Sequence, residues 1–170
     1  LILGASGFLG REVQPAFAAR GATVNVSSRG GPGLEKVDIR EADALRGLCA
    51  RVKPSSILLL AAWREPDVCE ERPDEARRLN VEPARVLAAC LPPETHLTFI
   101  STDYVFDGLK PPYREDSPRH AVSVYGQSKV EAEDALAGRK NTLILRVPLL
   151  IGGGPTLKDC GFIGQIVDSL

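Results

Sequence analysis

A tyrosine and a lysine stand four residues apart, at Tyr125 and Lys129, where the sequence predicts the first turns of a helix. Because residues four apart share a helix face, both side chains are expected to point the same way. A neighbouring ammonium favours the phenolate and lowers the pKa of a tyrosine by roughly 1–3 units. That shift would bring the hydroxyl toward the range in which general acid–base catalysis works. The pair alone is common on amphipathic helices, so its interpretation depends on its surroundings.

A threonine is expected beside this pair. Thr102 follows the apolar segment 96–100, which predicts a β-strand, and so lies at the carboxyl end of that strand. Ligands of open α/β sheets bind at this edge. There Thr102 can donate a hydrogen bond to a substrate carbonyl oxygen and stabilise the alkoxide that forms; the alternative is a strand-end cap. The predicted catalytic residues are therefore Thr102, Tyr125 and Lys129.

Glycines at positions 4, 7 and 10 follow the first apolar segment and open a predicted helix. In such a loop Gly4 would permit a tight turn, Gly7 a close approach of the backbone to a pyrophosphate, and Gly10 close helix packing. The helix N-terminus then offers free N–H groups to the phosphates. The strand before and the helix after this loop favour dinucleotide binding over a purely structural turn. The predicted cofactor loop comprises Gly4, Ser6, Gly7, Phe8, Leu9 and Gly10.

The end of the second predicted strand selects between the two nicotinamide cofactors. An acidic residue there binds the ribose 2′-OH of NAD, whereas an arginine accommodates the 2′-phosphate of NADP. The chain has Ser28 and Arg29 at this point and no carboxylate before Glu35. These two residues predict NADP(H), with NAD(H) as the alternative. Asp38 and Ile39 follow the third predicted strand, where the adenine ring would lie; an ordinary surface turn is the alternative.

The elements that must position these residues alternate along the chain. Apolar segments predict strands at 1–3, 22–26, 36–39, 56–61, 96–100 and 142–147. Helical periodicity predicts helices from the glycine loop to about 20, over 41–52, from 73 to before Pro92, over 124–137, and from Phe162 onward. With right-handed crossovers this alternation predicts an α/β doubly wound parallel sheet, the Rossmann fold. The continuous apolar strand 56–61 predicts helices on both faces of the sheet, and the irregular stretch 104–123 is expected to be a binding loop.

Composition excludes several classes of protein. The 170 residues carry 21 Lys+Arg and 22 Asp+Glu, a net charge of −1, so no basic excess favours nucleic acid. The longest apolar run, Ile57 to Trp63, is far shorter than the ~20 residues of a membrane helix. The cysteines lack the spacing of metal ligands, which favours reduced thiols in the cytoplasm and predicts no metal site. A disulfide or a metal role is the alternative. The cysteines are Cys49, Cys69, Cys90 and Cys160.

The length fits one domain. The chain starts at Leu1 inside a predicted strand and stops at Leu170 inside a predicted helix. We therefore expect one NADP(H)-binding Rossmann domain over residues 1–170 that is incomplete at both ends. A C-terminal substrate-binding part would then lie outside this chain.

Three motifs together resemble one family. The loop GASGFLG, the run from Ser101 to Gly108 and the pair Tyr125 and Lys129 resemble the extended short-chain dehydrogenases/reductases, and within them the dTDP-4-dehydrorhamnose reductase group. The chain is also similar to the regulatory beta subunit of methionine adenosyltransferases. By this resemblance Thr102, Tyr125 and Lys129 match catalytic positions, and Lys129 also holds the nicotinamide ribose.

The resemblance adds further site residues. Ala61 and Ala62 match positions that line the cofactor, and we include Pro148 among the cofactor contacts. Tyr104 matches a position that faces the sugar substrate. Asn80 matches a helix asparagine near the site, with a buried structural role as the alternative.

The implied activity is NADP(H)-dependent reduction of the keto group of a nucleotide-linked 4-keto sugar. The alternatives are a cofactor-binding regulatory subunit that docks onto a methionine adenosyltransferase catalytic subunit, and a nucleotide-sugar epimerase or dehydratase. Two departures favour the regulatory subunit. Leu149 stands where the rhamnose-type reductases carry a sugar-packing aromatic residue, and the segments 62–68 and 111–115 read closer to the subunit. A homodimer remains an open alternative.

Overall fold

Six parallel strands form the centre of the molecule in the computed structural model, which describes residues 1–152. The strands are β1 (Ile2–Leu3), β2 (Asn25–Ser27), β3 (Glu35–Lys36), β4 (Ser56–Leu59), β5 (His96–Thr102) and β6 (Thr142–Val147). Their order in the sheet is β3-β2-β1-β4-β5-β6, and every neighbouring pair is parallel. This order confirms the predicted doubly wound fold. It reverses between β1 and β4, the point at which such sheets open a crevice for a ligand.

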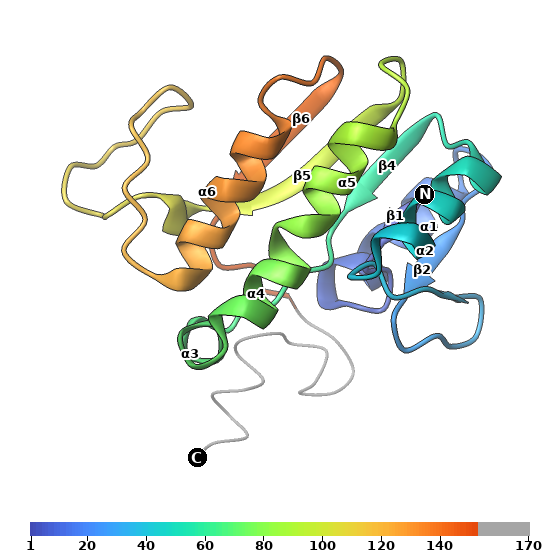
Figure 1. Cartoon of the computed structure of the whole chain (residues 1–170), viewed down its shortest axis with the longest axis horizontal. Helices are drawn as coiled ribbons and strands as arrows, with labels where there is room; N and C mark the ends of the chain where they lie inside the picture. Colours follow the sequence, from blue (N-terminus) through green and yellow to red (C-terminus); the bar gives the residue numbers. More distant parts are fainter. Residues whose placement is uncertain (153–170) are drawn as a thin grey trace.

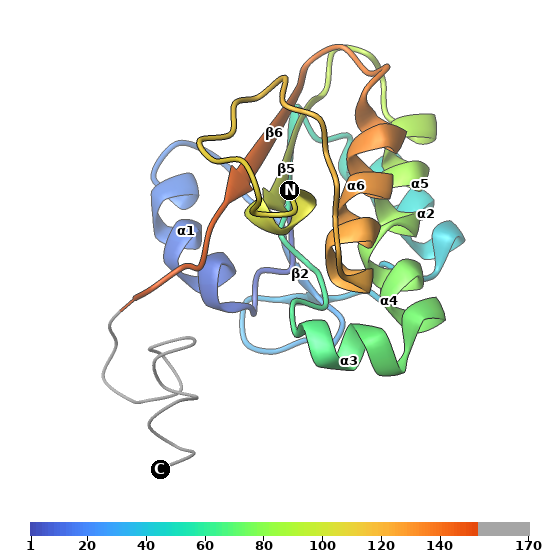
Figure 2. The ribbon, with the colours of Figure 1, turned by 90° about the vertical axis from the view of Figure 1, so that its left-hand side faces the viewer.

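The helices lie on the two faces of this sheet in unequal numbers. They are α1 (Phe8–Ala18), α2 (Ala42–Val52), α3 (Pro66–Glu71), α4 (Pro73–Asn80), α5 (Glu82–Cys90) and α6 (Val124–Leu136), with a short 3₁₀ turn, η1 (Asp103–Val105). Figures 1 and 2 show α1 on one side of the sheet and α2, α4, α5 and α6 on the other. Helix α6, which carries Tyr125 and Lys129, therefore lies on the face of the sheet that holds most of the helices.

The main core lies between the sheet and α2, α5 and α6. Its strand side consists of Leu3, Val26, Ile57, Leu59, Leu97 and Phe99, and its helix side includes Leu45, Leu48, Leu87 and Leu136. A smaller cluster on the other face joins Ile2, Ala5 and Leu58 with Val13 of α1. The prediction that both faces of the 56–61 strand are covered is thus confirmed at Leu58. On β6, at the edge of the sheet, Leu143 and Leu145 are 44% and 39% exposed.

The predicted helix after residue 73 is divided into α4 and α5 at Val81. The cause is Pro83, which lies in the first turn of α5 and has no N–H to continue the hydrogen bonds of α4. Helix α3 was not predicted, although Pro66 and Asp67 at its start are typical first-turn residues. Between β2 and β3 the chain forms a glycine-rich loop, with Gly30, Gly31 and Gly33 at positive φ.

The boundaries of the remaining elements agree with the predictions to within a few residues. Strand β6 has the predicted bounds, β5 extends to Thr102, and β3 lies one residue earlier and is shorter than expected. The stretch after η1 is irregular up to residue 123, as predicted. The predicted helix from Phe162 and the thiol of Cys160 lie outside the described residues. No helix within residues 1–152 is both long and apolar enough to cross a membrane.

Candidate functional site

The predicted site residues gather at one edge of the sheet because parallel strands end together. Leu3, Ser27, Lys36, Leu59, Thr102 and Val147 are the last residues of the six strands. The predicted site residues outside α6 follow these ends directly: the glycine loop, Ser28 and Arg29, Asp38 and Ile39, Ala61 and Ala62, Tyr104, and Pro148. The chain therefore brings the cofactor and catalytic candidates to the edge at which α/β sheets bind ligands.

The glycine loop has a geometry that larger residues would not permit. Gly4 has a φ of +95°, and a Cβ placed on it would lie 2.6 Å from the Ala61 nitrogen. A Cβ on Gly10 would lie 2.4 Å from the Gly4 oxygen. Gly7 is the N-cap residue of α1 and has no side chain to cover the helix N-terminus. The predicted roles of Gly4 in the turn and of Gly10 in close packing are thus confirmed by the backbone.

Two serines connect this loop with the end of β2. The hydroxyls of Ser6 and Ser27 lie 2.7 Å apart, and the Arg29 backbone N–H donates to Ser27 Oγ over 3.2 Å. Ser27 is buried, whereas Ser28 and Arg29 are exposed at the mouth of the site. The sequence prediction gave Ser27 no site role, although Ser27 directly precedes Ser28 and Arg29. The Ser27 side chain fixes the turn from which Arg29 projects.

The two residues predicted near the adenine differ in their availability. Both carboxylate oxygens of Asp38 accept hydrogen bonds from the Arg40 guanidinium, at 2.6–3.1 Å. These bonds lower the pKa of the Asp38 carboxyl against the opposing effect of desolvation. Ile39 is 5% exposed and packs in the main core. Only the backbone of Ile39 can therefore face a ligand.

Thr102, Tyr104 and Tyr125 meet at the end of β5. Thr102 Oγ1 accepts the Tyr104 backbone N–H at 3.2 Å and donates to Asp103 Oδ1 at 3.1 Å, so the strand-end cap is also present. The ring of Tyr104 stands edge-on to that of Tyr125, with centroids 5.7 Å apart. Tyr104 is 49% exposed. A polar ligand at this edge would meet one exposed and one half-buried phenol.

The pKa of Tyr125 is shifted in the direction opposite to the prediction. Burial raises it above the ordinary value, and a hydrogen bond with Thr102 lowers it less than burial raises it. The sequence prediction assigned the lowering to the Lys129 ammonium. Lys129 instead donates a 2.6 Å hydrogen bond to the Ile100 carbonyl and lies 4.1 Å from the centroid of the Phe99 ring. The predicted stabilisation of the phenolate by Lys129 is therefore wrong for this structure.

Lys129 is itself an unusual group. Its side chain is 2% exposed, and burial lowers its pKa to about 7, while the charge of Glu133 acts in the opposite direction. A lysine with such a pKa changes its charge near neutral pH, as few lysines do. Small changes around Lys129 will thus decide whether it presents an ammonium or an amine.

Asn80 holds the segment after β4 against α6. Its side-chain oxygen accepts the Trp63 backbone N–H at 2.8 Å, and its amide nitrogen donates to the Trp63 carbonyl and to Ser128 Oγ, each at 3.0 Å. Ser128 Oγ donates in turn to the Tyr125 carbonyl at 2.7 Å. Asn80 is 2% exposed. Its polar atoms are engaged within the protein, which supports the structural alternative and ties Trp63 to the helix that carries Tyr125.

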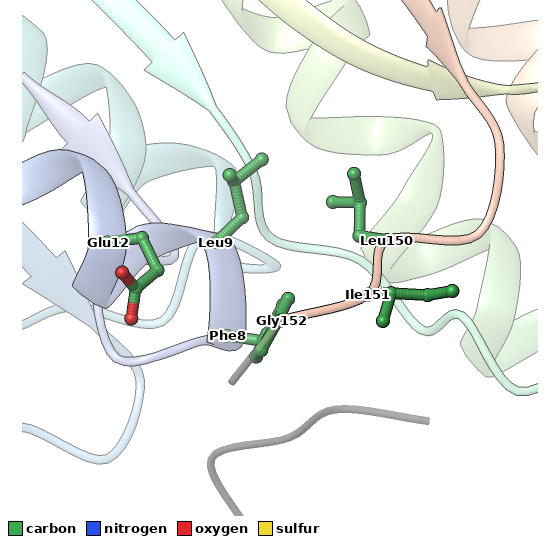
Figure 3. Close-up of a pocket in the computed structure, with 6 residues that line it drawn as sticks. All are labelled: Phe8, Leu9, Glu12, Leu150, Ile151 and Gly152. Carbon is green, nitrogen blue, oxygen red and sulfur yellow. The ribbon is translucent and has the colours of Figure 1, made fainter. Parts of the chain in front are cut away.

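The segment after β6 returns to the start of α1. A cavity of about 250 Å³ lies between them (Figure 3). Its lining residues are Phe8, Leu9, Glu12, Leu150, Ile151 and Gly152. A Cβ on Gly152 would lie 2.5 Å from Phe8 Cζ, so chain and ring are in close contact. Pro148, which is exposed, lies on the same segment.

Sequence reasoning also missed a buried carboxylate. Glu133 lies four residues after Lys129 on α6, is 2% exposed, and binds Ser101, Arg119 and Arg146. Its position on one helix face with Tyr125 and Lys129 was a signal in the sequence, since all three are spaced by four residues. The three cysteines of residues 1–152 are free thiols, and these residues contain no group of three or more potential metal ligands.

The sheet order, the glycine-rich β1–α1 turn and the Thr102–Tyr125–Lys129 set define a Rossmann-fold protein of the extended short-chain dehydrogenase/reductase type. The chain belongs to the RmlD substrate binding domain family, whose pattern matches residues 1–167. The resemblance predicted from the three motifs is thereby confirmed.

Individual relatives carry two different names. The chain is 40% identical over 163 residues to methionine adenosyltransferase 2 subunit beta of Xenopus tropicalis, covering 94% of the chain and 49% of the relative. It is 39% identical over 160 residues to a dTDP-4-dehydrorhamnose reductase of Streptomyces griseus, covering 91% and 51%. The chain thus spans about half the length of these relatives.

A solved structure matches the fold closely. It is a dTDP-4-dehydrorhamnose reductase of Bacillus anthracis in complex with NADP, with a TM-score of 0.82 and 25% identity. The match covers 99% of this chain and 58% of that one. A fold related to that of an NADP-bound protein is consistent with the dinucleotide geometry of the glycine loop.

Proposed function

We propose that the protein is an NADP(H)-dependent reductase that acts on the keto group of a nucleotide-linked 4-keto sugar. The observation that carries this proposal is the meeting of Thr102 and Tyr125 at the end of β5, with Lys129 on the same helix. Residues 1–170 would be the cofactor-binding half of such a protein. The names and the doubled length of the relatives support this division.

The glycine loop fits a dinucleotide. A Cβ on Gly4 or Gly10 would collide with neighbouring backbone atoms. Glycine at both positions therefore allows the turn to be narrow. Gly7 leaves the N-terminus of α1 open to an anion. The cofactor would be held by this loop, by Ser28 and Arg29 at the 2′-phosphate, and by Lys129 at the nicotinamide ribose. When bound, the nicotinamide supplies the hydride.

The protein side chains would orient the carbonyl and move a proton. Thr102 would turn its one hydroxyl hydrogen from Asp103 Oδ1 to the carbonyl oxygen and stabilise the negative charge that develops there. Tyr125 Oη donates a proton to that oxygen, which its raised pKa permits, because a protonated phenol is the donor form. Tyr104, half-exposed and edge-on to Tyr125, would line the sugar side.

The test is NADPH oxidation by the intact protein in the presence of dTDP-4-dehydrorhamnose. We expect turnover that depends on Thr102, so that Thr102→Val, which keeps the shape and removes the hydroxyl, reduces it strongly. Turnover equal in the wild type and in Thr102→Val would contradict the assigned role. NADPH binding without turnover on any nucleotide-linked keto sugar would reject the reductase and retain the cofactor site.

A second function is favoured by a specific similarity. The 40% identity to methionine adenosyltransferase 2 subunit beta and the exposed Leu149 favour a cofactor-binding regulatory subunit. Under this proposal the partner is a methionine adenosyltransferase catalytic subunit. Mixing the two purified proteins with NADP and measuring their association decides the matter. A stable complex together with silent reductase assays supports the subunit, and no complex together with turnover supports the enzyme.

A further inference from the structure

We propose that Glu133 is a positioning residue for this site: its buried carboxylate locks the strand end that carries Thr102 onto the helix that carries Tyr125 and Lys129, and places a negative charge one helical turn from Lys129. The inference rests on the proposed function in that it assigns a role in the proposed reductase site. Its structural part stands on contacts within the protein.

The carboxylate of Glu133 is fully engaged. Oε1 accepts from Ser101 Oγ at 2.5 Å and from Arg146 Nε at 3.1 Å. Oε2 accepts from an Arg146 terminal nitrogen at 2.8 Å and from an Arg119 terminal nitrogen at 3.0 Å. Buried charges are tolerated when they are paired and hydrogen-bonded to this extent. The four bonds come from three separate parts of the chain, namely β5, β6 and the irregular loop.

These partners are the neighbours of the catalytic candidates. Ser101 immediately precedes Thr102. In the register of the two strands, Arg146 of β6 is the partner of Ser101. Arg146 also donates to the Glu115 carbonyl at 3.0 Å, and its guanidinium lies 5.2 Å from the Phe106 ring centroid. Through Glu133 the end of β5, the end of β6 and the irregular loop are therefore fixed against one turn of α6. A shift of this turn would move Lys129 relative to Thr102.

The charge of Glu133 is retained despite its burial. Desolvation opposes ionisation, but hydrogen bonds from Arg146, Ser101 and Arg119, together with the charge of Arg146, lower the pKa of the carboxyl. One helical turn away, the same charge raises the pKa of Lys129 against desolvation. The carboxylate thus has two effects: its hydrogen bonds fix the ends of β5 and β6, and its charge raises the pKa of Lys129.

Other charged groups around α6 are engaged elsewhere. Arg77 of α4 and Arg85 of α5 pair with Glu131, and Asp103 and Tyr104 of η1 and Cys69 of α3 act on Tyr125. Glu70 of α3 accepts the Val124 backbone N–H. Among the described residues, Glu133 is the charged group that raises the pKa of Lys129 against burial.

Two substitutions separate charge from position. Glu133→Gln keeps the shape, removes the charge and turns one acceptor oxygen into an amide NH₂, whereas Ser101→Ala removes one bond to the strand and keeps the charge. The matched control is Glu131→Gln, because Glu131 lies on the same helix and also pairs with two arginines, Arg77 and Arg85, at the protein surface. All variants are made in the intact protein.

The first readout is the NADPH dissociation constant between about pH 5 and pH 9, because the pKa of Lys129 is about 7 and the variant is expected to titrate lower. In Glu133→Gln the inflection should move to lower pH by about one unit or more, since the opposite charge is lost and two arginines remain. Glu131→Gln should keep the wild-type inflection. An unchanged inflection in Glu133→Gln, or an equal shift in Glu131→Gln, would overturn the charge role.

The second readout is turnover of Ser101→Ala, which should fall several-fold at an unchanged inflection. Unchanged turnover would overturn the positioning role. Should Glu133→Gln fail to fold, Glu133→Asp keeps the charge with a shorter reach, and it should retain the inflection and lose turnover. If the intact wild type binds no NADPH, the proposed function fails. The titration of the Lys129 side chain by NMR in wild type and Glu133→Gln then still tests the charge role.

Discussion

The Lys129 ammonium donates to the Ile100 carbonyl over 2.6 Å instead of facing the Tyr125 phenol, although the two residues stand one helical turn apart. Spacing places the two Cα atoms on one face but does not decide where a long, flexible side chain ends. The Lys129 side chain passes over the Phe99 ring to reach the carbonyl on β5. The two groups consequently respond to burial separately, the phenol with a raised pKa and the lysine with a lowered one.

The lysine makes the stability of the fold depend on pH. Its pKa is about 7 in the folded protein against an ordinary 10.5, so the unfolded chain binds more protons between these values. Stability therefore rises with pH across this window, by at most about 1.4 kcal/mol per pH unit. Lys129→Met should flatten the rise and increase the stability near pH 7, as measured by urea unfolding at a series of pH values. Lys140→Met, an exposed control, should keep the slope, and a slope retained in Lys129→Met would refute this account.

Local patterns in the sequence were sufficient for the elements around the site. The glycine loop, β6 and α6 were predicted nearly at their observed bounds, because each is set by nearby residues: glycine spacing, apolar alternation and the Ser123 N-cap, whose Oγ accepts the Gly126 N–H. The break at Val81 was missed because the helical periodicity continues through it. Pro83 marked the break in the sequence.

The contacts between distant segments could not be predicted in the same way. Glu133 meets Ser101 and Arg146 only because β5 and β6 pair in a particular register, and no local pattern encodes that register. The same holds for Asn80, whose partners Trp63 and Ser128 are 17 and 48 residues away. The sequence thus predicted the parts of the site but not their hydrogen-bonded connections.

The proton donor is tested by Tyr125→Phe, which removes one oxygen and keeps the ring against Tyr104. Turnover should fall by roughly 10²–10⁴-fold, the usual contribution of a positioned acid–base group. NADPH affinity should change by less than about tenfold, because the phosphates are held by the glycine loop and the helix N-terminus. Steady-state kinetics and fluorescence titration measure the two quantities. The control Tyr113→Phe removes a phenol oxygen from the irregular loop and should have a far smaller effect on turnover. Near-normal turnover of Tyr125→Phe would reject the mechanism.

Cofactor choice is tested at Arg29, which is exposed beside the end of β2. A charge-assisted contact with a 2′-phosphate contributes about 1.5–3 kcal/mol. Arg29→Ala should thus weaken NADPH binding by roughly 10- to 150-fold and leave NADH binding nearly unchanged. Arg20→Ala, just after the C-terminal end of α1, serves as the control and should alter neither NADPH nor NADH binding. Equal losses for both cofactors in Arg29→Ala would show that this arginine does not select the phosphate.

The narrow glycine turn is tested by comparing two Gly→Ala substitutions in helices. In Gly10→Ala the new methyl group would lie 2.4 Å from the Gly4 oxygen and 2.6 Å from the Ala5 oxygen, both backbone atoms. Helix α1 must then move away from the turn, at a cost of about 1–3 kcal/mol in folding free energy. In Gly47→Ala, on α2, the methyl group meets nothing within 4 Å, so the substitution should stabilise by about 0.5–1 kcal/mol. Urea unfolding measures both changes, and NADPH titration should show a loss of affinity for Gly10→Ala alone. Equal stabilities of the two variants would mean that the turn tolerates a side chain, and unchanged NADPH affinity in Gly10→Ala would mean that Gly10 has no special role in cofactor binding.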